Sequence, residues 1–253
     1  MMPMKYPVRK DKPDSRDYHY KSTGRSIRDQ VDLRTWASPV ENQLELGSCT
    51  GQAVVGAYEL LLNQKFPTLF KDLSKLFVYY NARLLGGNVL EDEGAYLRDA
   101  IKAVKKYGVC DETVWPYIIE NFDISPTESS YTDAKKRNIK NYYRVYTVNE
   151  MLDALNQNYP IIIATLVYDS FDSVAGTTGV VPMPKAEEHV QGGHAMCLVG
   201  YNMRKRLFLA RNSFGEDWGF KGYCWIPFDY VEESFIDMWV VDLELTQQAI
   251  LRT

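Results

Sequence analysis

The chain has 253 residues, a formal net charge of -4 and a hydrophobic content of 45%, which is typical of globular proteins and excludes disordered and fibrous classes. Its short basic stretches, 135–137 and 204–206, lie far apart, so nucleic acid is not expected as a partner. No stretch approaches the roughly 18 apolar residues of a membrane span, and the first 20 residues lack the apolar core of a signal peptide. With only four scattered cysteines, we expect a cytoplasmic protein without a membrane partner.

The first part of the chain predicts helices that follow an irregular extension. The extension contains three prolines and many charges without a period. Beyond it, apolar residues recur at helical spacing and stop at helix-breaking residues. The expected helices are one that starts at Cys49 and ends before Pro67, one over residues 74–85, and one that ends at Gly108.

From about residue 140 onward, β-forming residues predominate, interrupted by a short helix that Thr147 and Glu150 introduce as a capping box. The expected strands are 160–168, 195–201, 207–212, 223–226 and 238–243. We therefore expect an α+β protein with a ligand-binding cleft between its halves. The expected parts are an N-terminal extension over residues 1–30, a mainly helical subdomain over 31–139 and a mainly β subdomain over 140–253.

Cys49 is a candidate nucleophile because it lies where a loop ends and a helix begins. Unpaired backbone N–H groups and the positive end of the helix dipole favour a thiolate at such a place. Taken alone, the residue is equally well interpreted as a buried structural cysteine.

His194 is one of only three histidines, and a glycine pair places it on an apolar strand. Asn212 ends the next strand, so a hairpin can bring its side-chain carbonyl to the far ring nitrogen of His194 and fix the tautomer that faces Cys49. Each residue alone is more often structural. Cys197 lies on the opposite face of the strand from His194, so no metal site is expected.

Together these residues resemble the papain family of cysteine peptidases. His194 follows Cys49 by 145 residues, within the roughly 130–150 of the family signature, whereas Asn212 follows it by 163. The resemblance spans about residues 31–227. Its landmarks, in order, are Gln43, the Gly-Ser before Cys49, Gly193-His194-Ala195, Asn212-Ser213-Phe214-Gly215, Trp218-Gly219 and Gly222-Tyr223.

The resemblance implies a papain-like fold, in which a helical half packs on an antiparallel, β-barrel-like half with the active site between them. It implies hydrolysis of a peptide or protein substrate through a thioester on Cys49, with His194 as base, Asn212 as its orienting group and Gln43 at the oxyanion. No cofactor is required. The residues expected to meet the substrate are Gly94, Ala95, Gly193 and Trp218. An acyl transferase or ligase with the same triad, or an inactive papain-like binding module, stays open as an alternative.

The chain also departs from the family pattern. Leu46 and Asp92 stand where the usual loop disulfide has its cysteines, which is typical of bacterial or intracellular members and predicts that all four cysteines are free thiols. Phe214 stands where a tryptophan usually shields the Asn–His hydrogen bond.

The N-terminal extension is too short and irregular to form the folded inhibitory domain that family members commonly carry. We expect it to lie along the surface of the β half, and an inhibitory extended strand laid across the cleft stays open as the alternative. With the extension on that surface, the full-length chain is predicted to be active without processing.

Overall fold

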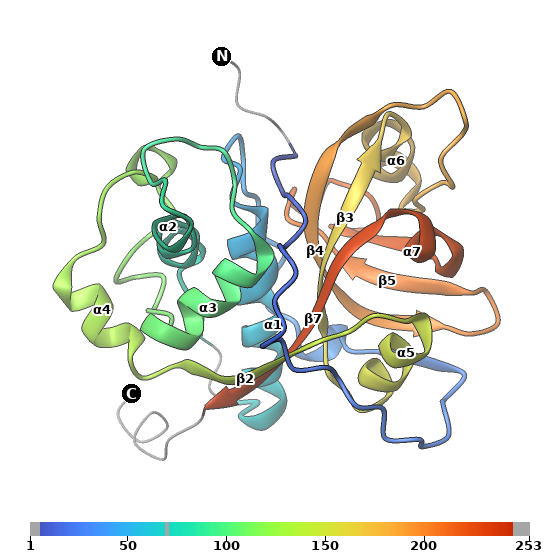
Figure 1. Cartoon of the computed structure of the whole chain (residues 1–253), viewed down its shortest axis with the longest axis horizontal. Helices are drawn as coiled ribbons and strands as arrows, with labels where there is room; N and C mark the ends of the chain where they lie inside the picture. Colours follow the sequence, from blue (N-terminus) through green and yellow to red (C-terminus); the bar gives the residue numbers. More distant parts are fainter. Residues whose placement is uncertain (1–5, 69–70, 245–253) are drawn as a thin grey trace.

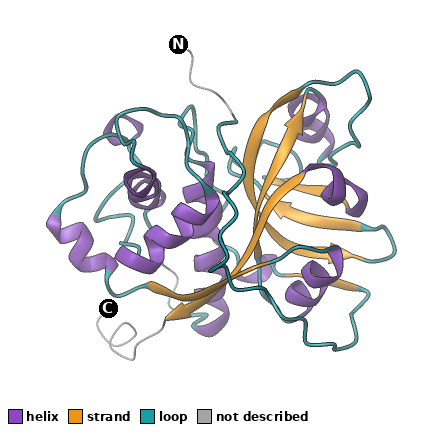
Figure 2. Cartoon of the chain, viewed as in Figure 1, coloured by secondary structure: helices purple, strands orange, loops and turns teal. Residues whose placement is uncertain are grey.

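A computed structural model describes residues 6–68 and 71–244, and it divides into a helical part and an antiparallel sheet (Figures 1 and 2). The helices are α1 (Cys49–Lys65), α2 (Lys75–Gly86), α3 (Leu97–Tyr107), α4 (Glu128–Ala134), α5 (Val148–Asn156), α6 (Gly176–Thr178) and α7 (Phe228–Ser234). The strands are β1 (Gln30–Asp32), β2 (Asn138–Arg144), β3 (Ile161–Tyr168), β4 (Val190–Asn202), β5 (Leu207–Arg211), β6 (Tyr223–Pro227) and β7 (Phe235–Glu244). Short helical turns are η1 (Arg34–Trp36), η2 (Ile119–Asn121) and the π-helical η3 (Phe171–Ala175).

The sheet has the strand order β2-β7-β3-β4-β5-β6, with β1 added beside β4. Its centre is the antiparallel pair β3 and β4, in which Thr165 lies opposite His194. The papain-like fold and the antiparallel sheet are confirmed, but the sheet remains open and does not form the barrel-like half expected from the sequence. The reason is that β2, the strand at one end, packs against α3 of the helical part while β6 forms the other end.

Helix α1 lies at the centre of the molecule and is covered on all sides. Every residue from 49 to 61 is buried, because α2 and α3 pack on one side of the helix and β3 and β4 on the other. Glu59, the one charged residue in that stretch, is bound by Lys75 at 3.1 Å and by the Ser38 hydroxyl at 2.5 Å. Both halves therefore share one hydrophobic core, and the start of α1 is held rigidly between them.

The helices expected to start at Cys49, to span residues 74–85 and to end at Gly108 are confirmed, and the capping box of Thr147 and Glu150 is formed at α5. Strand β4 begins at Val190, five residues before the expected start. Strands β1 and β2 and helices α4, α6 and α7 were not predicted. Within the described residues, no helix combines the length and apolar character needed to cross a membrane.

Candidate active site

Cys49 is the first residue of α1, where backbone N–H groups lie close to its sulfur. Ser48, the residue before it, uses its hydroxyl to bond the Tyr117 hydroxyl at 2.5 Å and does not cap the helix. The N–H groups of Cys49 and Thr50 therefore face the thiol, and the N–H of Ala195 on β4 reaches it from the sheet. Because Ala195 follows His194, this contact brings Cys49 to the strand that carries the histidine.

His194 and Asn212 meet as the hairpin of β4 and β5 predicts. His194 Nε2 lies 2.7 Å from Asn212 Oδ1, and Asn212 in turn is fixed by the N–H of Ser213, which donates to the same oxygen at 2.8 Å. The Phe214 ring stacks on the imidazole with a centroid distance of 4.9 Å. Phe214 thus covers the contact, as expected from its place in the sequence.

Gln43 is buried beside these residues and is held at both ends of its side chain. Its Oε1 accepts a hydrogen bond from the Ser213 hydroxyl at 2.6 Å, and its Nε2 donates to Leu46 O at 2.9 Å. An amide nitrogen carries two hydrogens, so the contact with Leu46 leaves one N–H for a ligand. Ser213, which joins Gln43 to Asn212, was named in the sequence only as part of a landmark and was given no role there, although its position next to Asn212 was a signal.

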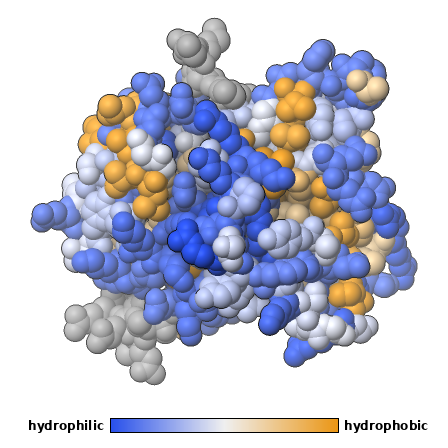
Figure 3. Space-filling model, viewed as in Figure 1, coloured by the Kyte–Doolittle hydropathy of each residue, from blue (hydrophilic) through white to orange (hydrophobic). Residues whose placement is uncertain are grey.

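Residues 6–9, which we call the strap, lie along the seam between the helical part and the sheet, where hydrophilic side chains predominate at the surface (Figures 1 and 3). Val8 N donates to Gly193 O at 2.9 Å, and Gly193 N donates to Tyr6 O at 3.0 Å. The expectation that the extension lies along the surface of the β half is wrong for the strap, which lies between the two halves. The physical reason is that the strap has a partner on each side of the seam: it pairs with the main chain of Gly193 on β4 and packs through Pro7 on Gly94 of the helical part.

The same expectation is confirmed farther along the extension. There, Tyr20 N donates to Arg144 O of β2 at 2.8 Å, and the Thr23 hydroxyl donates to Asp153 of α5 at 2.8 Å.

Two of the expected substrate residues are glycines that make room for the strap. A Cβ on Gly193 would lie 2.1 Å from Val8 O, and one on Gly94, at φ +74, would lie 2.6 Å from Pro7 Cγ. Only a residue without a side chain lets another backbone approach this closely. Gly193 and Gly94 therefore face each other across the strap.

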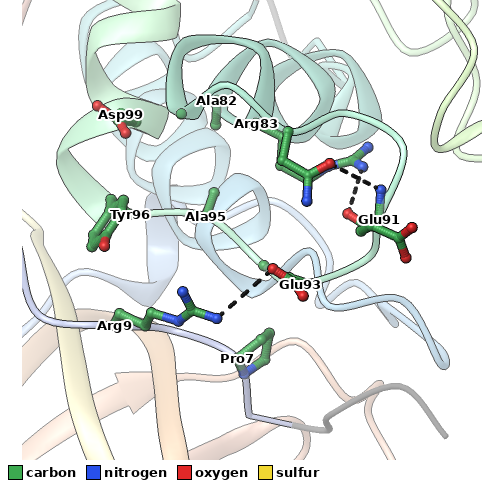
Figure 4. Close-up of a pocket in the computed structure, with 12 residues that line it drawn as sticks. Pro7, Arg9, Ala82, Arg83, Glu91, Glu93, Ala95, Tyr96 and Asp99 are labelled. Carbon is green, nitrogen blue, oxygen red and sulfur yellow. Dashed lines mark hydrogen bonds and ion pairs between the residues drawn. The ribbon is translucent and has the colours of Figure 1, made fainter. Parts of the chain in front are cut away.

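Ala95 and Trp218, the other two expected substrate residues, lie on opposite sides of the strap. Ala95 lines a cavity of about 90 Å³ in the helical part, beside Pro7 and near the ion pair of Arg9 with Glu93 (Figure 4). Trp218 packs on Phe214 with a centroid distance of 5.9 Å. Trp218 thus belongs to the aromatic surroundings of His194, whereas Ala95 is set apart from them.

The strap closes the site. Cys49 and His194 each have 0% of their surface exposed. Burial raises the pKa of the Cys49 thiol to about 12, against the smaller lowering by the backbone N–H groups around it. The thiolate expected from the helix start is therefore not favoured in this state, because desolvation outweighs the helix terminus.

Asp11 anchors the segment that follows the strap. Its Oδ1 accepts from the N–H of Arg98 in the first turn of α3 at 3.2 Å, its Oδ2 from Trp239 Nε1 at 3.1 Å, and its own N–H donates to Asp237 Oδ2 at 2.7 Å. Asp237 is also bound by the Arg144 guanidinium. Burial, and then the charge of Asp11, raise the pKa of Asp237 to about 6.

All four cysteines are free and buried, which confirms the expected lack of a loop disulfide. Across residues 6–68 and 71–244, no three His, Cys, Asp or Glu side chains are grouped so as to hold a metal ion.

Comparisons with known proteins agree with this geometry. The model of the family described as papain family cysteine protease matches residues 27–241. An uncharacterized peptidase C1-like protein of Acanthamoeba polyphaga mimivirus is 38% identical over 237 residues, which cover 88% of this chain and 75% of the viral protein. Xylellain, a cysteine protease from Xylella fastidiosa, is 30% identical with a TM-score of 0.90 over 97% of both chains. Bromelain from Ananas comosus, in complex with the E64 inhibitor, is 21% identical with a TM-score of 0.68 over 86% of this chain and 100% of bromelain, and so supports the fold alone.

Proposed function

Because the chain belongs to the papain family of cysteine proteases, we propose that it hydrolyses peptide bonds through a thioester formed on Cys49. Membership of a protease family implies peptide or protein substrates. The observation that carries the proposal is the 2.7 Å contact between His194 Nε2 and Asn212 Oδ1, covered by Phe214, at the strand that meets the start of α1.

The contact with Asn212 fixes the roles of the two ring nitrogens of His194. A carbonyl oxygen only accepts, so Nε2 carries a proton, and Nδ1 is the nitrogen that exchanges a proton with the Cys49 thiol. In the proposed reaction, Nδ1 takes the thiol proton and the sulfur attacks the substrate carbonyl carbon. The same nitrogen then protonates the leaving amine as the C–N bond breaks, which leaves an acyl thioester on Cys49.

Hydrolysis of the thioester repeats the sequence with water. His194 Nδ1 accepts a proton from water, whose oxygen attacks the thioester carbonyl. The C–S bond then breaks to release the carboxylic acid, and the Cys49 sulfur leaves as a thiolate that takes the proton back from Nδ1. In both steps, negative charge develops on the carbonyl oxygen. The second N–H of Gln43 Nε2 and the N–H of Cys49 are the donors available to it.

Substrate can reach Cys49 only after the strap has left the seam. Displacement of the strap removes the segment that covers the thiol, and it lets water and a polar substrate replace the apolar cover that raises the Cys49 pKa. The comparisons do not support the alternatives of an acyl transferase or an inactive binding module, and product analysis with an added amine distinguishes transfer from hydrolysis.

The proposal is tested by titration with a thiol-directed peptide electrophile, followed by mass mapping of the modified residue. We expect one modified thiol per chain, at Cys49, and a parallel loss of hydrolysis of a fluorogenic peptide. Modification of Cys110, Cys197 or Cys224 with loss of turnover, or turnover that survives full modification of Cys49, would contradict the assignment.

A further inference from the structure

The side chain of Tyr6 fills a recess beside His194. The Tyr6 ring meets Phe171 and His194 edge to face, with centroid distances of 6.1 and 5.5 Å, and Phe214 at 6.4 Å. The Tyr6 hydroxyl donates to Asp172 Oδ2 at 2.5 Å. Only 5% of Tyr6 remains exposed, so both its ring and its hydroxyl are matched by the recess.

The recess lies where a substrate of the proposed reaction must pass. Its wall includes the imidazole of His194, and the main chain of Tyr6 is held by Gly193, the residue before that histidine. An extended peptide that displaces the strap meets the same main-chain groups of Gly193. From this geometry, and resting on the proposed function, we propose that the recess is a side-chain subsite that selects tyrosine in peptide substrates. In this subsite, Asp172 accepts a hydrogen bond from the phenol hydroxyl of the substrate.

The chemistry of the recess distinguishes a phenol from related side chains. A carboxylate accepts hydrogen bonds only, so a tyrosine hydroxyl gives Asp172 the hydrogen bond that Tyr6 makes, whereas a phenylalanine ring offers no donor. An acidic side chain would place like charges together. A lysine offers a cation to Asp172 but has no ring to make the edge-to-face contacts with Phe171 and His194. Sites that bind a substrate hydroxyl discriminate strongly against the analogue that lacks it.

The test uses peptides of one sequence in which Tyr, Phe, Lys or Ala stands at one position, scanned from three residues before the cleaved bond to three after it. Each Tyr peptide competes with its Phe, Lys or Ala counterpart in one reaction with the full-length chain. Both peptides compete for the same enzyme molecules, namely those whose strap is displaced. The ratio of their kcat/KM values therefore does not depend on the fraction of the enzyme in that state. We expect Tyr to exceed Phe by roughly tenfold to a hundredfold at one position.

The specific variant is Asp172→Ala, and the matched control is Glu216→Ala, which removes an exposed carboxylate from the loop between Phe214 and Trp218. In Asp172→Ala the ratio of Tyr to Phe is expected to fall to about twofold or less while the Phe peptide is still cleaved. In Glu216→Ala the ratio is expected to stay at its wild-type value.

Three results would overturn the subsite. They are a ratio near one at every position, a ratio that Asp172→Ala leaves unchanged, and a preference for lysine over tyrosine. These results all require cleavage that depends on Cys49, so they leave the proposed function standing. If no peptide is cleaved by any form of the chain, the proposed function fails and the subsite fails with it.

Discussion

Replacement of Tyr6 by alanine is predicted to open the strap in the intact chain. The tyrosine makes the strap's aromatic contacts in the seam, and its hydroxyl is bound to a carboxylate. Alanine keeps the main-chain hydrogen bonds with Gly193 but removes both the ring and the hydroxyl. The substitution therefore raises the free energy of the closed state, which loses these contacts. It changes the free energy of the open state little, because there the side chain is in water.

The magnitude follows from the burial of the side chain. Truncation of a buried aromatic residue to alanine costs about 3–5 kcal/mol, and each 1.4 kcal/mol changes an equilibrium constant tenfold. Taking the low end, since the strap lies at the surface of the body and not within its core, the fraction of molecules with an open strap should rise by about a hundredfold.

The assay is the rate at which a small thiol reagent modifies Cys49 in the folded, full-length chain. When opening and closing are fast, this rate is proportional to the open fraction, so Tyr6→Ala should react about a hundred times faster than the wild type. Tyr18→Ala is the matched control, because Tyr18 belongs to the same extension but is 70% exposed, and its rate should stay within about twofold. Equal rates for wild type and Tyr6→Ala would refute the idea that the Tyr6 side chain holds the strap closed.

Three further predictions concern the nucleophile, the extension and the anchor. Cys49→Ala should abolish peptide hydrolysis with an unchanged circular dichroism spectrum, whereas Cys110→Ala should stay active; the reverse pattern would contradict the assignment of the nucleophile. A chain that starts at Lys10 should hydrolyse a fluorogenic peptide faster than the full-length chain at similar thermal stability. One that starts at Arg28 should melt roughly 10 °C lower, since buried Arg98 loses the carboxylate of Asp17 and Arg144 keeps only that of Asp237. No gain in rate from the first truncation would show that the full-length chain is already active. In the folded chain the pKa of Asp237 is raised to about 6, so the fold favours the neutral form of this carboxyl group. The resulting contribution to stability is fully present below about pH 4 and is lost as the pH rises through 6. Denaturant titrations should therefore show the wild type losing roughly 2–3 kcal/mol relative to Asp237→Asn between pH 4 and 7.5, and parallel pH curves would rule this out.

The sequence predicted those parts of the site that depend on local signals. Cys49 lies at a helix start because a loop that ends in Gly47-Ser48 precedes a largely apolar stretch. Strands β4 and β5 form a hairpin because a short polar turn joins two apolar strands. The placement of Asn212 opposite His194 follows from that hairpin. These features could be predicted from neighbouring residues and from the spacing of known landmarks alone.

An extension laid across the cleft was open as an alternative, but the contacts that fix the strap were not predictable, because its partners are remote in the sequence. Tyr6 docks on Gly193, and Asp11 on Arg98 and Asp237, so no period within the extension marks either contact. The pKa of Cys49 was predicted in the wrong direction for the same reason. A helix start can be recognised from adjacent residues, but burial by a segment about 40 residues away cannot.

The short connection between the strap and Asp11 has a consequence for inhibitor measurements. Because Asp11 is fixed in the body, the strap competes with any soluble ligand as a tethered competitor, and short tethers give effective concentrations in the millimolar range or above. A reversible inhibitor of the full-length chain should therefore show a weaker apparent affinity than its contacts with the seam provide, by the factor by which the closed form outnumbers the open form. For a covalent inhibitor at saturating concentration, the rate of inactivation should instead level off at the rate of strap opening, whatever the reactivity of the warhead.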